Sequence, residues 1–314
     1  MSNMTNILIY SENGDNIQNI SKYVRKNVSM MYAQISTISI NNNEIEGYYN
    51  SGIDRVYDYR DSDVTSFDLE QYRAIFMAVI SKSESSILLF GTTRKDTELI
   101  SSLAASLNAG CITGCFEVNL IDGKLEAKKY MFGGSVISSQ VLSGDVLFAT
   151  VSLSQSDETT IPSTVRELVE LNVKVPIPRV NLIEQIGKKK VASTLKDAKI
   201  IISVGRGLKK REDVKLLNDL AVKLNASIGC TRPIAADQKW FDEWIGISGH
   251  KVAPDLYVAC GISGTIQHLS GIRDSKIIIS INNDPNASIH KVSDYSIVAD
   301  LYKILPVLTE ALKK

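Results

Sequence analysis

Cysteine is scarce in this sequence, and neither sign of charge is in excess. The chain has 314 residues and only four cysteines, so a disulfide framework like that of small secreted domains is not expected. We interpret the four as reduced thiols in a cytoplasmic protein. Lysine and arginine together number 35, as do aspartate and glutamate, and the net charge is zero. No global field therefore draws the protein to nucleic acid or to an anionic membrane.

Long apolar runs are also missing. A helix that spans a bilayer needs roughly 20 consecutive apolar residues, whereas the longest runs here, such as residues 276–281, have the length of a strand. The first 16 residues contain no lysine or arginine, which argues against a secretory signal or a transit peptide. We expect a soluble protein with no segment inserted directly in a membrane.

Motifs for several kinds of chemistry are absent. The three histidines, His250, His268 and His290, are not spaced as metal ligands, and the spacing of Cys111 and Cys115 is not that of a CxxC redox motif. The sequence contains no GxSxG elbow, no Walker loop and no GxGxxG fingerprint. We therefore expect no metal site, and hydrolysis and ordinary nicotinamide chemistry lose support.

The first half of the chain alternates between apolar runs of strand length and helical patterns. Residues 97–107, for example, place their apolar side chains on one face at helical spacing. Such alternation predicts a parallel sheet with crossover helices. Strands are predicted at residues 7–10, 35–40, 55–59, 74–79 and 87–90, and helices at residues 16–30 and 97–107.

The pattern changes at residue 111. Residues 111–121 and 124–132 predict two strands joined by an Asp122-Gly123 hairpin turn, and residues 136–151 keep the β character. We expect antiparallel strands to extend the first sheet. Prolines 176 and 178 hold the next segment extended, and we place a domain boundary between residues 187 and 188.

The second half returns to a regular alternation of strands and helices. The predicted fold class is therefore α/β with two domains. Residues 1–187 form an N-terminal domain with a mixed sheet, and residues 188–314 form a C-terminal domain with a Rossmann-like parallel sheet. The strands of the second domain are predicted at residues 198–204, 226–230, 255–260, 276–281 and 295–299, with a helix at residues 211–224.

Glycine and polar residues follow each strand of the second domain. In an open α/β sheet, ligands bind at the carboxyl ends of the strands. Gly205-Arg206-Gly207 offers amides and a guanidinium suited to a diphosphate, although an ordinary turn with a solvent-facing arginine has the same pattern. Residues 261–268 add a serine hydroxyl at a helix start, where the alternative is a serine cap with the histidine packed against the sheet. Asp300 could simply cap the last helix, and Asn282 could simply turn the chain.

Six segments of the second domain form a specific combination: residues 204–209, 231–233, 252–257, 261–268, 281–285 and 298–301. Their sequences include VGRGLK, VAPDLY, GISGTIQH and INNDP. Together they closely resemble the α subunit of electron-transfer flavoproteins. The first domain agrees more loosely, through residues 110–118, 122–127 and 131–136.

The resemblance implies that the second domain binds FAD. In that family the counterpart of Arg232 lies over the isoalloxazine, a hydroxyl at the position of Ser248 reaches toward N5, and the counterpart of His268 faces the C2 carbonyl. Cations and donors at that edge raise the flavin potential, because reduction places negative charge there. The resemblance implies that three residues lie near the diphosphate, ribityl or adenine parts of FAD: Arg206, Ser263 and Asp300. It implies that five residues lie near the flavin ring: Thr231, Arg232, Ser248, Gln267 and His268. It also implies that the site is completed by Ile245, Gly246, Ile247, Gly264, Thr265, Ile266, Asn282 and Leu301.

One segment departs from the common family pattern. Where most members have Gln-Thr-Gly-Lys, this chain has Ile247-Ser248-Gly249-His250, so one polar flavin contact is missing and the hydroxyl comes from serine. This context, with Trp240 upstream, looks more like the branch associated with nitrogen fixation and carnitine metabolism than the respiratory branch. The resemblance therefore does not fix the redox potential or the electron donor.

The resemblance implies an electron carrier rather than an enzyme. It implies a heterodimer with an electron-transfer flavoprotein β subunit, donors such as acyl-CoA dehydrogenases, and a quinone reductase or ferredoxin-type acceptor. Two alternatives stay open: a subunit of a flavin-based electron-bifurcating complex that oxidises NADH, and a non-redox nucleotide-binding module.

Overall fold

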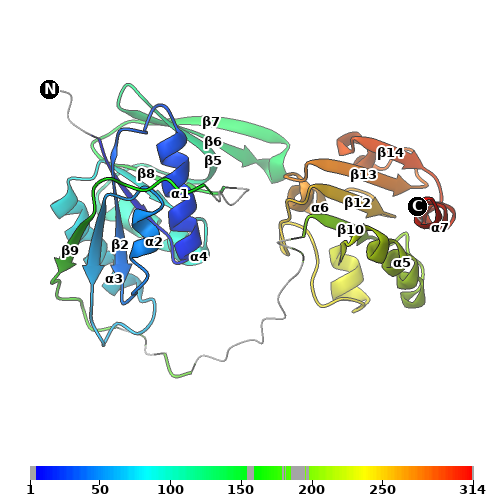
Figure 1. Cartoon of the computed structure of the whole chain (residues 1–314), viewed down its shortest axis with the longest axis horizontal. Coiled ribbons are helices and arrows are strands. Elements are labelled where there is room, and N and C mark those ends of the chain that lie inside the picture. The colour runs from blue at the N-terminus through cyan, green and yellow to red at the C-terminus, as the bar shows by residue number, and fades with distance from the viewer. Residues whose placement is uncertain are drawn as a thin grey trace. The chain divides into compact units, whose positions relative to one another are not determined.

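The computed structural model describes residues 5–153, 159–178, 180, 182–184, 195 and 198–312. The chain divides into two compact units. The first comprises Met1–Met131 and Ser135–Ile186, and the second comprises Phe132–Gly134 and Gly187–Lys314. The predicted boundary between residues 187 and 188 lies outside the described residues. Figure 1 shows the elements of each unit.

The first unit is built on a nine-stranded mixed sheet with the order β7-β6-β5-β8-β4-β1-β2-β3-β9. All neighbours pair in parallel except β5 with β6 and β6 with β7, which are antiparallel. The strands are β1 (Asn6–Tyr10), β2 (Gln34–Ile40), β3 (Arg55–Tyr59), β4 (Ile87–Phe90), β5 (Cys111–Ile121), β6 (Lys124–Met131), β7 (Val136–Leu142), β8 (Leu147–Val151) and β9 (Glu167–Leu171).

Helices pack against the buried central strands of this sheet. Every residue of β4 and β8 is buried, as expected for strands that are covered on both faces. A short 3-10 helix, Phe132–Gly134, lies between β6 and β7 in the sequence. The helices are α1 (Gly14–Lys26), α2 (Glu46–Tyr49), α3 (Leu69–Ser83) and α4 (Arg94–Ser106), with α1 packed on α2 and α3 packed on α4.

The strand predicted at residues 74–79 is wrong, because these residues lie inside α3. Seven consecutive apolar residues, 74–80, concealed the helical period. The side chains that are buried, Ile75, Phe76, Val79 and Ile80, follow the spacing of one helix face. Asp68 caps this helix by accepting a hydrogen bond from a backbone amide of its first turn.

The run at residues 136–151 contains two strands with opposite roles. Strand β7 continues the antiparallel hairpin, as predicted, whereas β8 pairs in parallel with both β4 and β5. Gly144, with φ +155°, lies in the turn between them. Neither α2 nor β9 was predicted from the sequence.

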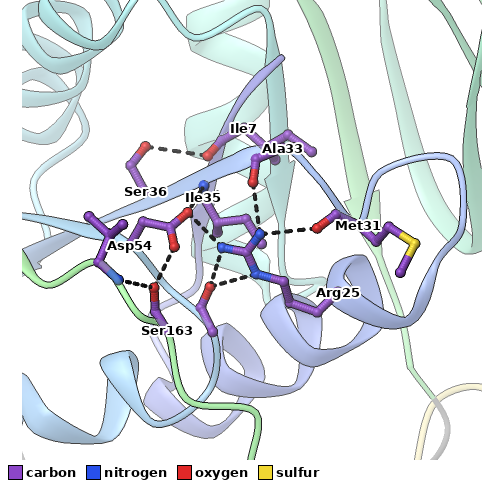
Figure 2. Close-up of polar contacts among 10 residues, drawn as sticks. Ile7, Arg25, Met31, Ala33, Ile35, Ser36, Asp54 and Ser163 are labelled. Carbon is purple, nitrogen blue, oxygen red and sulfur yellow. Dashed lines mark hydrogen bonds and ion pairs between the residues drawn. The ribbon is translucent and has the colours of Figure 1, made fainter. Parts of the chain in front are cut away.

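A buried ion pair fixes the segment that leads into β9. Arg25 Nη2 lies 2.6 Å from Asp54 Oδ2, and both side chains are largely buried, at 16% and 13% exposed. The same carboxylate accepts a hydrogen bond from the Ile35 amide at 2.8 Å and one from the Ser163 hydroxyl. Figure 2 shows these contacts together with the hydrogen bonds that the Arg25 guanidinium donates to the carbonyls of Met31 and Ala33.

The second unit contains a five-stranded, fully parallel sheet with the order β11-β10-β12-β13-β14. The two units thus confirm the predicted α/β fold class, with a mixed sheet followed by a parallel one. The elements are β10 (Ile200–Val204), a 3-10 helix (Arg211–Asp213), α5 (Val214–Leu224), β11 (Ser227–Cys230), a π-helix (Pro233–Asp237), β12 (Leu256–Cys260), α6 (Ile266–Ile272), β13 (Ile277–Asn282), a 3-10 helix (Ser288–Val292), β14 (Tyr295–Val298) and α7 (Leu301–Ala311).

Apolar side chains alternate between the two faces of this sheet. On β10, Ile202 and Val204 pack with residues of α5 and α7, which lie against each other (Figure 1). Ile201 joins a second cluster on the other face that includes Ile272 of α6. Within the described ranges, no helix is both long and apolar enough to cross a membrane.

Candidate functional site

The order of strands in the second unit creates a crevice beside β10. The chain passes from β10 to β11 on one side and then crosses to β12 on the other side. At such a switch point the loops after the two central strands diverge, and ligands bind there, at the carboxyl ends. The loops in question begin at Gly205, after β10, and at Gly261, after β12.

These two loops approach each other closely through glycine. The Gly207 amide donates to the Gly261 carbonyl at 3.0 Å. A Cβ atom on Gly207 would lie 2.5 Å from the Gly261 Cα, a distance that backbone atoms cannot tolerate. Gly261 itself has φ +61°, a conformation that favours glycine. Glycine is therefore required for the two loops to meet at the crevice.

A cavity of about 300 Å³ lies at this crevice. Its wall combines backbone from the two glycine loops with polar side chains from the ends of β13 and the start of α7. Of the predicted residues, it is lined by Arg206, Thr231, Ser263, Gly264, Thr265, His268, Asn282, Asp300 and Leu301.

A second cavity, of about 340 Å³, lies next to the first. The two cavities share the lining residues Thr231, Pro233, Thr265 and His268. Of the predicted residues, the second cavity adds Arg232, Ile245, Gly246, Ile247, Ser248 and Gln267. Ile266 is a predicted residue that lines neither cavity. It is the first residue of α6, and its side chain is 54% exposed.

Two predicted polar residues also hold the backbone of the site. Asp300 is the N-cap of α7, and its carboxylate accepts from the Tyr302 amide at 3.0 Å. Asn282 donates to the Ile262 carbonyl at 2.8 Å and accepts from the Asp284 amide at 2.9 Å. The capping and turning alternatives are thus correct for these residues, and both residues line the first cavity as well.

His268 lies between the two cavities with both ring nitrogens engaged. Nδ1 lies 3.0 Å from the Ile245 carbonyl, which can only accept, so Nδ1 carries the proton. Nε2 lies 2.9 Å from the Tyr257 hydroxyl, which donates to it when the ring is neutral. Burial lowers the pKa of His268 to about 4, although the Ile245 carbonyl opposes this shift. The imidazole is therefore neutral at pH 7, and in this arrangement neither nitrogen is left to donate to a ligand.

Ser248 is held in the second cavity by a neighbouring indole. Nε1 of Trp244 donates to the Ser248 hydroxyl oxygen at 3.3 Å. Since the oxygen accepts this bond, the hydroxyl proton of Ser248 remains to be donated elsewhere. Both residues line the second cavity.

Several residues of the first cavity escaped the sequence prediction. Gly205 and Gly207 flank Arg206 and could have been included on the glycine pattern alone. Lys209 and Tyr302 carry no such signal, because their place in the site depends on a contact between a loop and α7. The other unpredicted lining residues are Pro233, Gly261, Ile262, Ile281 and Asn283 in the first cavity and Trp244 in the second.

The first unit has a switch point of the same kind, between β1 and β4, but a buried carboxylate of the chain bonds to the loop after β1. Asp96 is fully buried and accepts from the Ser11 hydroxyl and the Glu12 amide, each at 2.8 Å. It also completes the capping box of α4 with Thr93. Amides at a switch point usually bind an external anion, and here Asp96 takes that position. In the first unit these donors are therefore satisfied by a side chain of the chain itself.

The cysteines and the acidic residues form no metal site in the described part of the chain, where no cluster of three or more histidine, cysteine, aspartate or glutamate residues occurs. All four cysteines are free thiols, as predicted. Burial raises the pKa of Cys111 and Cys115 to about 11 and that of Cys230 and Cys260 to about 12. Thiols with such pKa values are inert, which fits structural roles.

Comparison with known proteins finds separate family matches in the two units of the chain. Residues 29–176 match the electron transfer flavoprotein domain, and residues 194–273 match the electron transfer flavoprotein FAD-binding domain. The chain is 34% identical over 268 residues to the electron transfer flavoprotein subunit alpha of Bacillus subtilis, covering 84% of this chain and 82% of the relative. It is 32% identical to the putative electron transfer flavoprotein subunit YdiR of Escherichia coli and to protein FixB of Salmonella paratyphi A, in each case over 78% of this chain and 80% of the relative. The chain therefore belongs to the electron transfer flavoprotein alpha-subunit family, and its second unit is an FAD-binding domain.

Proposed function

We propose that this chain is the FAD-carrying subunit of a heterodimeric electron carrier. It takes electrons from dehydrogenases, such as acyl-CoA dehydrogenases, and delivers them to a quinone reductase or a ferredoxin-type acceptor. It converts no substrate of its own, and it works in the cytoplasm with an electron-transfer flavoprotein β subunit. The observation that carries the proposal is the pair of cavities at the carboxyl ends of the parallel sheet, which share four lining residues.

The shape and chemistry of these cavities fit FAD. FAD is elongated, with a diphosphate between its adenosine and ribityl parts. The first cavity offers exposed glycine backbone, Arg206 and the Ser263 hydroxyl, which suit a diphosphate. The second offers Arg232, Gln267 and Ser248 beside the apolar surfaces of Trp244 and Ile245, which suit a flat ring with polar edges. We place the diphosphate in the first cavity and the flavin ring in the second.

The charges around the second cavity favour the reduced form of such a ring. Bound FAD supplies the ability to accept and release electrons. The chain supplies the cationic guanidinium of Arg232 and the hydroxyl proton of Ser248. Positive and donor groups stabilise negative charge gained on reduction, so they raise the potential. The neutral His268 adds no charge of its own.

The names of its relatives support a two-subunit carrier. Two of them are named as electron transfer flavoprotein subunits, one of them as alpha. In a heterodimer that passes electrons between larger enzymes, the flavin must be reachable from outside. Arg232 and Ser248 are both exposed to solvent at the second cavity, which suits transfer to a docked partner.

A reduction assay tests the proposal. The chain is purified together with its β subunit, loaded with FAD, and mixed without oxygen with an acyl-CoA dehydrogenase and its acyl-CoA substrate. We expect the flavin absorbance near 450 nm to bleach only when the dehydrogenase is present. A flavin that is bleached by NADH alone would instead show an NADH-oxidising complex. A flavin reduced by neither donor would contradict the assignment of dehydrogenase donors.

A further inference from the structure

The hydroxyl of Tyr302 joins two parts of the second unit, the loop after β10 and the start of α7, and both parts contribute residues to the lining of the first cavity. It accepts a hydrogen bond from the Lys209 backbone amide at 2.8 Å, and it donates one to Asp213 Oδ2 at 2.6 Å. Lys209 lies two residues before the 3-10 helix that follows β10, and Asp213 is the last residue of that helix, whereas Tyr302 is the second residue of α7. One hydroxyl thus ties the loop after β10 to the last helix.

The loop that Tyr302 holds is the one that carries Arg206. On either side of Arg206, the Gly205 amide donates to the Cys260 carbonyl and the Gly207 amide donates to the Gly261 carbonyl, each at 3.0 Å. Leu208, which is 1% exposed, anchors the loop in the core. Beyond Leu208, the contact with Tyr302 fixes the loop from the direction of α7. Without the hydrogen bonds of the Tyr302 hydroxyl, residues 209–213 would no longer be held to α7.

The same contact also arranges the charges near the cavity. If the Asp213 carboxylate turned toward an anion bound in the cavity, its negative charge would weaken the binding of that anion. The hydrogen bond from the Tyr302 hydroxyl holds one oxygen of this carboxylate in place. Burial and Asp213 both raise the pKa of Tyr302, so the hydroxyl keeps its proton and remains a donor. The ammonium of Lys209 lies 5.7 Å from the centre of the Tyr302 ring, within the range of a cation–π contact, and Lys209 lines the cavity.

We propose that Tyr302 is a positioning residue for the anion-binding loop of residues 205–210 and thereby controls how long FAD is retained. This inference rests on the proposed placement of the FAD diphosphate beside Arg206. Tyr302 lines the first cavity and is not among the residues of the second. Its effect should therefore fall on cofactor affinity and not on the redox potential of the ring.

The test compares FAD binding by the full-length chain in complex with its β subunit. The variant Tyr302→Phe removes only the hydroxyl. We expect about a tenfold rise in the dissociation constant for FAD through faster release, because the loop then has to be ordered on binding without the two hydrogen bonds of the Tyr302 hydroxyl. The matched control is Tyr295→Phe, because Tyr295 lies on β14 with its side chain 63% exposed and lines neither cavity. We expect it to bind FAD like the wild type.

Two further measurements separate positioning from a general loss of stability. Hydrogen exchange of the Lys209 amide in the apoprotein should speed up in Tyr302→Phe, and the midpoint potential of the bound flavin should stay at the wild-type value. An unchanged dissociation constant, or a loss of affinity accompanied by a shifted potential, would overturn the inference. The variant Arg206→Ala is measured alongside. If it leaves FAD affinity unchanged, the placement of the diphosphate fails, whatever Tyr302→Phe does.

Discussion

The Tyr257 hydroxyl lies 2.9 Å from Nε2 of His268, and both side chains are buried in the core of the FAD-binding domain. With Nδ1 bonded to the Ile245 carbonyl at 3.0 Å, the imidazole has one donor and one acceptor, each satisfied. Protonation of Nε2 would set two donors against each other, unless the Tyr257 hydroxyl turned away. The surroundings of His268 therefore favour the neutral form by geometry as well as by burial.

The stability of the second unit should fall in mild acid because of His268. Its pKa is about 4 in the folded protein, against about 6.5 in an unfolded chain. Between these values the unfolded state binds a proton that the folded state does not, so the free energy of unfolding decreases as the pH falls through this window. From pH 7 to pH 5 we expect a loss of about 2 kcal/mol from this residue. Urea unfolding followed by tryptophan fluorescence measures it, because Trp240 and Trp244 both lie in this unit.

His268→Gln provides the comparison for this prediction. The variant is expected to be less stable at pH 7, but to lose about 2 kcal/mol less than the wild type between pH 7 and pH 5. His250→Gln is the control, since the side chain of His250 is 23% exposed. Equal pH dependence in the wild type and in His268→Gln would show that the pKa of His268 is the same in the folded and the unfolded protein.

Arg232→Ala should lower the midpoint potential of the bound flavin. Arg232 is the exposed cation of the second cavity, and its charge favours an electron-rich ring. A tenfold change in the reduction equilibrium corresponds to about 59 mV for one electron, and we expect a decrease of that order. Spectroelectrochemical titration measures it, with Arg232→Lys as the charge-conserving variant. Equal potentials in Arg232→Ala and the wild type would place the ring elsewhere.

Gly207→Ala should weaken FAD binding without changing the first unit. The added Cβ would lie 2.5 Å from the Gly261 Cα, so the two loops at the crevice must move apart. Overpacking of this kind costs about 1–3 kcal/mol, and we expect a corresponding loss of FAD affinity in fluorescence titration. Gly14→Ala is the matched control, because the nearest atom to its Cβ would be 3.9 Å away. Tight FAD binding by Gly207→Ala would mean that the loops can separate freely.

Asp54→Asn should destabilise the first unit by about 2–4 kcal/mol, since Arg25 would keep its buried charge without a carboxylate. Far-UV circular dichroism during urea unfolding reports the loss, while the tryptophan transition of the second unit should not move. Glu46→Gln is the control, because the pair of Glu46 with Arg166 is exposed and should contribute less than about 1 kcal/mol. A loss in Asp54→Asn as small as in the control would mean that solvent screens the Arg25 pair.

Strands bounded by turn residues were predictable from the sequence alone. Strands β3, β4 and β5 begin and end at the predicted residues, because a short apolar or alternating run flanked by polar residues and glycine has few alternatives. The helix α3 was missed because its buried face lies inside a continuous apolar run. Strand β9 was missed for another reason: it is an edge strand, and Leu168 within it is 53% exposed. Its alternation carries no clear apolar face.

The candidate site shows the same limit. Gly264, Ser263 and Arg232 were predictable because they lie within four residues of the ends of β11 and β12, and ligands bind at the carboxyl ends of parallel strands. Tyr302 and Lys209 were not, because their contact joins segments 93 residues apart in the sequence. Ile266 was included because it stands between Thr265 and Gln267, but at a helix start successive side chains point in different directions.

The pairing of β9 with β3 sets the order in which the first unit can be completed during synthesis. Arg55 bonds to Glu167, 112 residues further along the chain. At about 5–20 residues per second, a ribosome needs roughly 5–20 s to pass from one to the other. Throughout that interval the outer edge of β3 has no partner strand from its own chain, and an open edge is where nascent chains associate with one another. In the second unit the paired residues of β10 and β12, such as Ile200 and Leu256, are 56 positions apart, so the corresponding wait is about half as long.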